Sequence, residues 1–346
     1  MPIFYRREHV KTLLTPRKLI LRTCVSLVLL AGVMAACTMI GSQPIQAAKM
    51  FDRQHGGRDY EIFVHVRVPR VFLAALVGAA LASAGVVFQA LLQNPLADPY
   101  ILGISSGAGL GATIAASAGL DWTLWGRSPM AVCAFAGALA TVWLVWWLGR
   151  LARGAGPTGL LLAGVVVNAF FGALIMFVTS LSGSRQVQTT IFWLMGNMTE
   201  ETFPVLWISG GCIVASVAAL YLLGPLLNAI SFGRADARSL GINTSKVAMA
   251  SFAIAAFVTA VAVSLSGLIG FVGLIVPHAV RLLVGPDHRQ LLPISAAAGA
   301  MFLTAADTVA RTAVAPAQLP VGVVTAIFGG PFFLLLLIRH AKKLWR

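Results

Sequence analysis

Long apolar runs separated by short polar segments dominate the sequence. A helix needs about 20 apolar residues to cross the hydrocarbon core of a bilayer. Ten runs approach this length, and together they predict an all-α, polytopic membrane protein with about ten transmembrane helices. The predicted spans are 23–41, 71–92, 101–120, 130–148, 158–182, 205–227, 247–266, 268–284, 292–310 and 321–338. Only the stretch SGLIG separates the seventh span from the eighth, so the boundary between those two is weakly defined.

Composition supports membrane embedding and leaves no room for a large soluble domain. Of the 346 residues, 58% are hydrophobic and 10% are charged, whereas soluble domains carry about 25% charged residues. The N-terminus resembles a signal peptide, but its apolar run is long enough to span a bilayer, so we interpret it as a retained first helix. We therefore expect a basic N-terminus (1–22), one membrane domain (23–338) and a short C-terminus (339–346).

The basic residues indicate how the chain is oriented. With both termini in the cytoplasm, 17 of the 25 lysines and arginines fall in cytoplasmic segments, as the positive-inside rule favours. Because the basic residues cluster at the ends of apolar runs, the net charge of +14 indicates control of topology and not binding of nucleic acid.

One cytoplasmic segment, residues 228–246, contains the compact polar stretch FGRADARSLGINTSK. Ala235, Ala237, Leu240 and Gly241 predict a short helix with small residues on one side and arginines on the other, ended by the glycine. Two interpretations remain open on composition: a solvated connector, or an element that docks into a groove on a partner protein.

Motifs for chemistry within the chain are scarce. None of the six lysines follows a glycine, which excludes the P-loop motif for ATP, and no spaced set predicts an enzyme site, a metal site or a cofactor. Asp307 is the one clear intramembrane carboxylate. With Arg311 four residues later it predicts a local ion pair, and the alternative is a proton relay. His278, which follows Pro277, is interpreted as structural because polar groups satisfy the carbonyl that a proline frees.

Glycine and alanine recur within the spans at intervals of three and four residues. GAALASAG (78–85) and GISSGAGLGA (103–112) are the longest such stretches. Small residues at this spacing let helix backbones approach closely in a membrane. We therefore interpret both stretches as helix-packing surfaces.

Three long blocks resemble the FecCD-type permeases of ABC importers, which serve ferric siderophores, haem and cobalamin. The blocks are RVPRVFLAALVGAALASAGVVFQALLQNPLADPYILGISSGAG, GLIGFVGLIVPHAVRLLVGPDHRQLLP and AADTVAR followed by LPVGVVTAIFGGPFF. Together with SFGRADARSLGI they extend from about residue 67 to 338. The resemblance implies the permease subunit of a type II ABC importer in the bacterial inner membrane, with no cofactor of its own.

The resemblance also implies partners and site residues. The partners would be a second permease copy in a homodimer, two ATPase subunits and a substrate-binding protein outside. The coupling helix that contacts the ATPase would comprise Gly233, Ala235, Ala237, Leu240 and Gly241. Docking of the binding protein would use Arg67, Arg70 and Arg311, and the cytoplasmic gate would use Asn94, Leu96 and Thr158.

Two positions depart from the family pattern. Pro157 replaces a gate hydroxyl, and Gln318 replaces an acidic residue, so an ion pair there would be lost. The sequence favours a permease for ferric siderophores or a similar large metal chelate. Alternatives are a cobalamin or haem permease of the same family and, from another class, a proton-coupled secondary transporter that uses Asp307.

Overall fold

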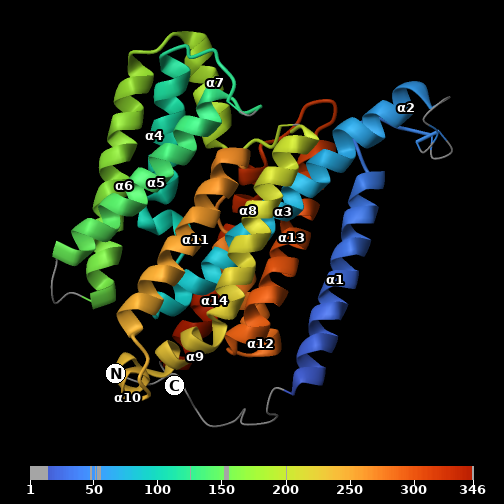
Figure 1. The fold of residues 1–346 in the computed structure, drawn as a ribbon. Coiled ribbons are helices and arrows are strands. Elements are labelled where there is room, and N and C mark those ends of the chain that lie inside the picture. Colours follow the sequence, from blue (N-terminus) through green and yellow to red (C-terminus); the bar gives the residue numbers. More distant parts are fainter. Residues whose placement is uncertain are drawn as a thin grey trace.

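The protein is a bundle of α-helices in the computed structural model, which describes residues 15–46, 49–50, 52, 56–124, 126–151, 156–199 and 201–344 (Figure 1). No strand occurs within these ranges. The helices are α1 (Pro16–Met39), α2 (Gly57–Glu61), η1 (Ile62–Arg67), α3 (Val68–Leu91), η2 (Pro99–Leu102), α4 (Ile104–Ser117), α5 (Pro129–Leu151), α6 (Gly156–Ser180), α7 (Ser184–Leu194), α8 (Phe203–Leu222), α9 (Gly224–Phe232), α10 (Arg234–Ser239), α11 (Thr244–Ser266), α12 (Val272–Val284), α13 (His288–Thr312) and α14 (Val321–Leu344).

Every predicted span corresponds to a helix. Seven helical stretches among the described residues are long and apolar enough to cross a membrane, and they contain α1, α3, α5, α6, α8, α11 and α13. The other three predicted spans correspond to α4, α12 and α14, of which α4 has 14 residues and α12 has 13. The prediction of an all-α, polytopic membrane protein is confirmed.

Several boundaries differ from the prediction for local reasons. The span predicted at 205–227 is two helices, because Gly224 and Pro225 begin α9 just after α8 ends at Leu222, and proline suits the first turn of a helix. The span predicted from residue 268 begins at Val272, because Gly267 and Phe271 have positive φ angles of 67° and 70°. Such angles are incompatible with a continuous helix.

Two helical segments lie in regions that the apolar pattern leaves as polar loops. Residues Gly57–Arg67 are helical and extend α3 beyond the predicted start of its span. Residues Ser184–Leu194 form α7, which packs against α4 at the end of the molecule opposite α10 (Figure 1).

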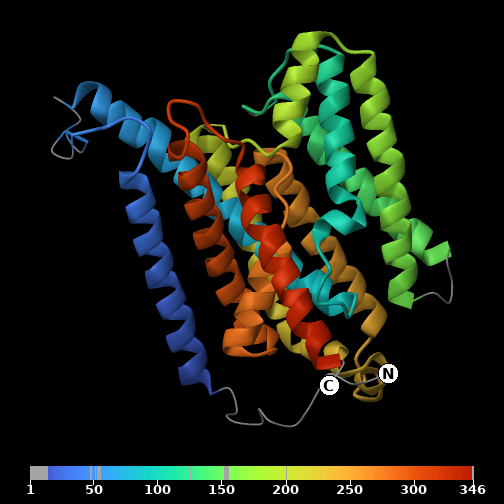
Figure 2. The same ribbon diagram turned by 180° about the vertical axis from the view of Figure 1, so that it is seen from behind.

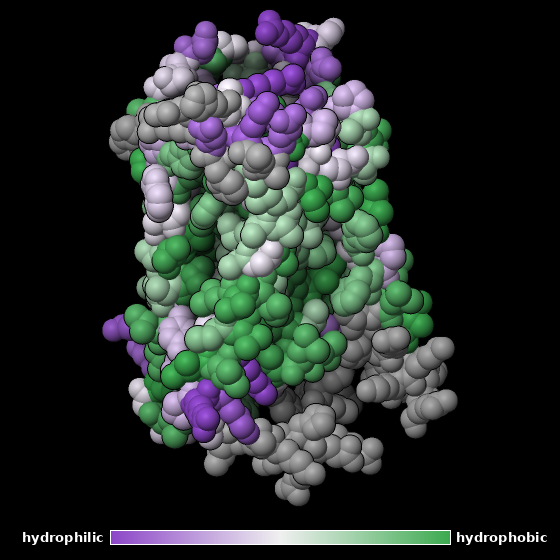
Figure 3. Space-filling model, turned by 90° about the vertical axis from the view of Figure 1, so that its right-hand side faces the viewer, coloured by the Kyte–Doolittle hydropathy of each residue, from purple (hydrophilic) through white to green (hydrophobic). Residues whose placement is uncertain are grey.

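On the face shown in Figure 3, apolar side chains form a band, and polar side chains gather at the two ends of the molecule. Exposed apolar side chains on the membrane-spanning helices include Val28 of α1, Phe72 of α3 and Phe177 of α6. In the C-terminal half of α5, Trp143 and Trp147 are stacked with 6.1 Å between ring centroids. Such exposed aromatics are typical of the interface between membrane and water.

Helix α3 lies at the centre of the bundle and approaches its neighbours through glycine. A Cβ atom at Gly78 would overlap the carbonyl oxygen of Gly299 in α13, and one at Gly85 would overlap that of Gly273 in α12. In the second small-residue stretch, a Cβ atom at Gly107 would overlap Thr141 of α5. Both stretches therefore pack helices closely, as predicted from their spacing.

Gln89 of α3 completes the backbone bonding of α12. Pro277 has no N–H to donate to the carbonyl oxygen of Gly273 one turn earlier. The Nε2 atom of Gln89 donates to that oxygen at 3.3 Å, and its Oε1 atom accepts from Arg281 at 3.2 Å. His278 is also buried, but a glutamine 188 positions before Pro277 supplies this bond. Such a partner is not visible in the local sequence.

Candidate functional site

The segment 228–246, which we call the coupling segment, lies at the end of the bundle where α12 ends and α13 begins (Figures 1 and 2). Its helix α10 ends at Ser239, and Gly241, which follows the cap residue Leu240, has a φ of 80°. The N–H of Gly241 donates to the Arg238 carbonyl at 2.9 Å, and the N–H of Ile242 donates to the Ala237 carbonyl at 3.1 Å. This pair of bonds is a Schellman motif, so the predicted stop at Gly241 is confirmed.

The outward side of the coupling segment is more apolar than its composition suggests. Phe232 is 80% exposed and Leu240 is 74% exposed, and Ala235 is also exposed. Ala237 is only 1% exposed, because it faces the bundle and not the solvent. The prediction that the small residues share one side of the helix is therefore wrong for Ala237, which lies on the opposite side from Ala235.

Polar bonds attach the coupling segment to α3 and α13, and one bond within the segment joins α10 to the start of α11. Arg234 donates to the carbonyl oxygen of Leu91 at the end of α3, at 3.4 Å. Arg238 donates to the hydroxyl of Thr244 at the start of α11, at 3.2 Å. Asn228 donates to Asp287, which caps α13, at 2.8 Å. A force applied to the coupling segment would therefore reach α3, α11 and α13 directly.

The predicted gate residues lie close to this attachment. Asn94 and Leu96 are in the turn that follows α3, where the Asn94 side chain accepts the N–H of Leu96 at 2.9 Å. Leu96 is exposed. Thr158 and Pro157 belong to the first turn of α6, but their side chains lie outside the described part of the chain. The gate assignment therefore stays a prediction.

Asp98, at the end of this turn, is a buried carboxylate. It caps η2 by accepting the N–H of Tyr100 at 2.9 Å. Burial raises the pKa of Asp98 to about 6, although the bond from Tyr100 opposes the rise. Because the folded state holds this proton more tightly than the unfolded chain does, the ionised side chain lowers stability as the pH rises through this range.

We expect Asp98→Asn to stabilise the protein at pH 7.5 by about 1–3 kcal/mol and to change little at pH 4. Asparagine is as good a helix cap as aspartate, so the bond to Tyr100 is kept while the cost of the buried charge is removed. Thermal unfolding of both proteins at several pH values would test this. Equal differences at pH 4 and 7.5 would contradict it.

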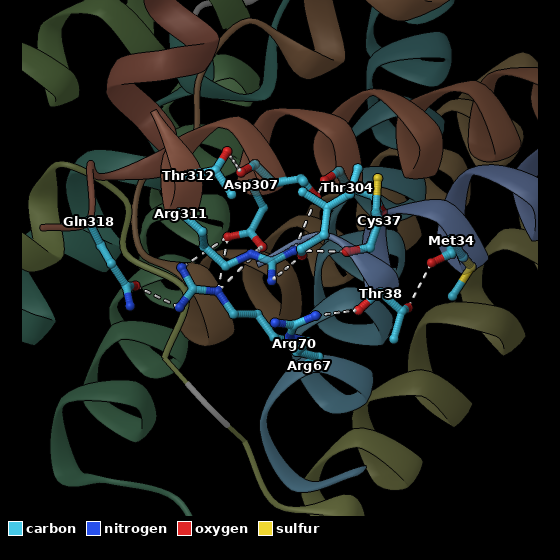
Figure 4. Close-up of polar contacts among 12 residues, drawn as sticks. Met34, Cys37, Thr38, Arg67, Arg70, Thr304, Asp307, Arg311, Thr312 and Gln318 are labelled. Carbon is cyan, nitrogen blue, oxygen red and sulfur yellow. Dashed lines mark hydrogen bonds and ion pairs between the residues drawn. The ribbon is translucent and has the colours of Figure 1, made fainter. Parts of the chain in front are cut away.

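The second group of predicted residues lies near the start of α3 and the end of α13, at the opposite end of the bundle (Figure 1), and its side chains lie close together (Figure 4). We call Arg67, Arg70, Arg311, Asp307 and Gln318 the outer arginine cluster. Asp307 is 1% exposed, and the three arginines are buried as well. The sequence therefore identified residues that lie together, although they come from η1, α3, α13 and the loop before α14.

Asp307 forms ion pairs with two arginines. The Nε atom of Arg311 lies 2.9 Å from Asp307 Oδ2, which confirms the predicted pair within α13. The Nη2 atom of Arg70 lies 3.1 Å from Asp307 Oδ1. Arg70 also donates to Gln318 at 2.8 Å, so the glutamine provides a hydrogen bond where the family pattern would place a carboxylate.

Arg67 and Arg311 also hold the end of α1. Arg67 donates to the carbonyl oxygens of Thr38, Met39 and Gln43, and its bond to Met39 is 2.7 Å long. Arg311 lies within 3.5 Å of the carbonyl oxygens of Cys37 and Ile40. The last carbonyls of a helix lack partners within it and carry partial negative charge, so the guanidinium groups stabilise this end.

The arginines therefore have partners within the chain itself. A carboxylate of a docking protein would have to compete with these partners for the guanidinium groups. The role of Arg67, Arg70 and Arg311 in docking stays a prediction.

A helical bundle of this kind, with an apolar surface and polar side chains at its ends, defines a polytopic membrane protein. Residues 27–339 match the model of the FecCD transport family. The chain belongs to this family, so the predicted resemblance is confirmed.

Curated relatives agree with this assignment. The chain is 37% identical over 319 residues to the hemin transport system permease protein HmuU of Yersinia pestis, covering 92% of this chain and 95% of HmuU. It is 45% identical over 274 residues to the cobalamin import system permease protein BtuC of Halobacterium salinarum, covering 79% of this chain and 72% of that protein. It is 41% identical over 282 residues to the ABC transporter permease protein YvrB of Bacillus subtilis, covering 81% of this chain and 80% of YvrB.

A solved structure shares the fold. It is an inward-facing conformation of an ABC transporter of metal-chelate type, with a TM-score of 0.81 and 28% sequence identity. The alignment covers 92% of this chain and 99% of that chain. The family and the fold therefore identify a permease of ABC transport, a class whose partners are ATPase subunits and substrate-binding proteins.

Proposed function

We propose that the chain is the transmembrane subunit of an ABC importer that carries a ferric siderophore or a similar large metal chelate into the cell. The match to the FecCD family over residues 27–339 carries this proposal. Separate ATPase subunits supply the energy, since the sequence has no P-loop of its own. Haem and cobalamin are the alternative cargoes, because two relatives are named for hemin and cobalamin transport.

The ATPase binds at the coupling segment in this proposal. The exposed side chains of Phe232 and Leu240 provide apolar surface on a segment that is otherwise polar. The hydrogen bonds to α3, α11 and α13 provide the route by which ATP-driven closure of the ATPase subunits moves the transmembrane helices. Rigid-body movement of packed helices is a common way to switch between two states.

The proposed orientation places the coupling segment, and both termini, in the cytoplasm of a bacterial inner membrane. The distribution of lysine and arginine supports this orientation. A second copy of the chain completes the pathway as a homodimer, and a substrate-binding protein delivers cargo at the outer end, near the outer arginine cluster.

The contacts of Asp307 argue against the proton-coupled alternative. A proton relay needs a carboxylate that gains and loses its proton during transport. Asp307 is paired with two guanidinium groups at 2.9 and 3.1 Å, so both of its carboxylate oxygens are already engaged by arginines. Its contacts are those of a structural ion pair.

Uptake into proteoliposomes tests the proposed function. The chain is reconstituted with the ATPase and the binding protein encoded beside it, and uptake of radioactive iron chelates, haem and cobalamin is measured separately. We expect uptake only with all three proteins and ATP, and with one class of cargo. Uptake by the chain alone that stops when a protonophore dissipates the proton gradient would overturn the proposal.

A further inference from the structure

Asn228 lies at the junction between the coupling segment and the start of α13. It belongs to α9, whose residues Leu227 and Ile230 are buried in the bundle. A Cβ atom at Gly224, at the start of α9, would be 3.6 Å from the backbone N of Arg289. The backbone of α9 therefore packs against the start of α13 at the place where the Asn228 side chain forms its bonds.

The Asn228 side chain uses both ends of its amide group. Its Nδ2 atom donates to Asp287 Oδ1 at 2.8 Å. Its Oδ1 atom accepts the backbone N–H of His288 at 2.8 Å and lies 2.7 Å from His288 Nδ1. Since Oδ1 can only accept, the bond assigns the hydrogen of the His288 ring to Nδ1. One side chain thereby joins α9 to the first residues of α13.

The acceptor on α13 is held in place by further bonds. Asp287 Oδ1 also accepts the backbone N–H of Arg289 at 3.0 Å and so caps the helix. Burial alone would raise the pKa of Asp287, but bonds from Arg289 and Asn228 outweigh it and hold the pKa below its usual value. The carboxylate therefore remains ionised at neutral pH and is a strong acceptor for Asn228.

Helix α13 connects this junction with the outer end of the molecule. It runs from His288 to Thr312, a length of roughly 37 Å at 1.5 Å per residue. Asp307 and Arg311 of the outer arginine cluster lie near its far end. Gly299, near its middle, packs directly on Gly78 of α3. A displacement of the start of α13 therefore acts on α3 and on the outer cluster.

We propose that Asn228 is a positioning residue that transmits movement of the coupling segment to α13. This inference rests on the proposed function, because it concerns the step between ATP hydrolysis and transport. The bonds of Arg234 and Arg238 attach the same segment to α3 and α11, but each uses one hydrogen bond to a neutral oxygen. Asn228 makes bonds to three groups of α13 and its cap, one of them a carboxylate.

The test measures how many cargo molecules are imported per ATP hydrolysed by the complete complex in proteoliposomes. We expect Asn228→Ala to lower this ratio at least fivefold while the amount of assembled complex stays at the wild-type level. Alanine keeps α9 helical but removes all three bonds to α13. The matched control is Ser216→Ala in α8, whose hydroxyl donates to the Cys212 carbonyl of its own helix, and it should keep the wild-type ratio.

Variants of Asp287 test the same bond from the other side. Asp287→Asn retains an oxygen that accepts from Asn228 and caps α13, so it should keep most of the ratio. Asp287→Ala removes that oxygen and should lower the ratio, though less than Asn228→Ala, which also removes the two bonds to His288. If Asn228→Ala yields no complex, the comparison of the two Asp287 variants still tests whether the bond between Asn228 and Asp287 transmits the movement.

Three results would overturn the inference. The first is a wild-type ratio in Asn228→Ala, and the second is equal ratios in Asp287→Ala and Asp287→Asn. The third is a loss of assembled complex with an unchanged ratio in what remains, since that result indicates a role in folding alone. Absence of ATP-dependent uptake in the wild-type complex would be a failure of the proposed function and not of this inference.

Discussion

Replacing Asp307 with alanine should destabilise the folded protein by about 3–5 kcal/mol, the range measured when one partner of a buried ion pair is removed. Asp307 is 1% exposed and is bonded to both Arg70 and Arg311. Without it, three buried arginines would face one another with no carboxylate among them. Thermal unfolding of the purified variant in lipid nanodiscs, together with its yield as a monodisperse species, measures the effect.

Two comparisons isolate the buried charge as the cause. Asp121 is an exposed aspartate in the loop after α4, and Asp121→Ala should change stability by less than about 0.5 kcal/mol. Asp307→Asn keeps one oxygen acceptor but loses the charge, so its effect should fall between those of the two alanine variants. An Asp307→Ala protein that unfolds at the wild-type temperature would show that the ion pairs contribute nothing to the fold.

The apolar pattern predicts most of this fold, because a membrane imposes a simple requirement on length and hydrophobicity. Each predicted span overlaps a helix, and the spacing of small residues identified α3 as a packing surface. Boundaries were less predictable. The break between α8 and α9 depends on Gly224 and Pro225, which a window of twenty residues averages with their apolar neighbours.

Contacts between distant residues could not be predicted in the same way. The sequence offers Arg311 as the partner of Asp307, because the two lie one helical turn apart. Arg70 is 237 positions away, and only the packing of α3 against α13 brings it to the same carboxylate. The bond between Asn228 and Asp287 likewise depends on where α9 meets α13, and no local pattern marks it.

The sequence also does not indicate which side of a short helix is buried against the rest of the protein. Ala235 and Ala237 are two positions apart and therefore point to different sides of α10. Composition alone groups them as small residues, but the structure buries Ala237 and exposes Ala235. A bulky residue at position 237 would therefore disturb the packing of α10 on the bundle before it could disturb a partner. Such a substitution is a poor test of contact with the ATPase.

Phe232 and Leu240 are better probes of that contact, because their side chains are 80% and 74% exposed. We expect the double variant Phe232→Asp with Leu240→Asp to bind the ATPase subunit at least a hundredfold more weakly than wild type. Burying each apolar side chain at an interface contributes about 1.5–3 kcal/mol, and about 2.7 kcal/mol corresponds to a hundredfold change in affinity. Titration of the ATPase onto the variant in nanodiscs measures the loss.

The fold itself should survive both substitutions, because neither side chain contributes much to the buried core. The thermal unfolding temperature should therefore stay within a few degrees of wild type. Val314 is an exposed apolar residue at the opposite end of the molecule, so Val314→Asp controls for the effect of added charge and should bind the ATPase normally. Wild-type affinity in the double variant would place the ATPase contact elsewhere, whereas weakened binding by Val314→Asp would indicate a general effect of charge. Only a loss confined to positions 232 and 240 supports the coupling segment as the surface through which ATP hydrolysis reaches the membrane helices.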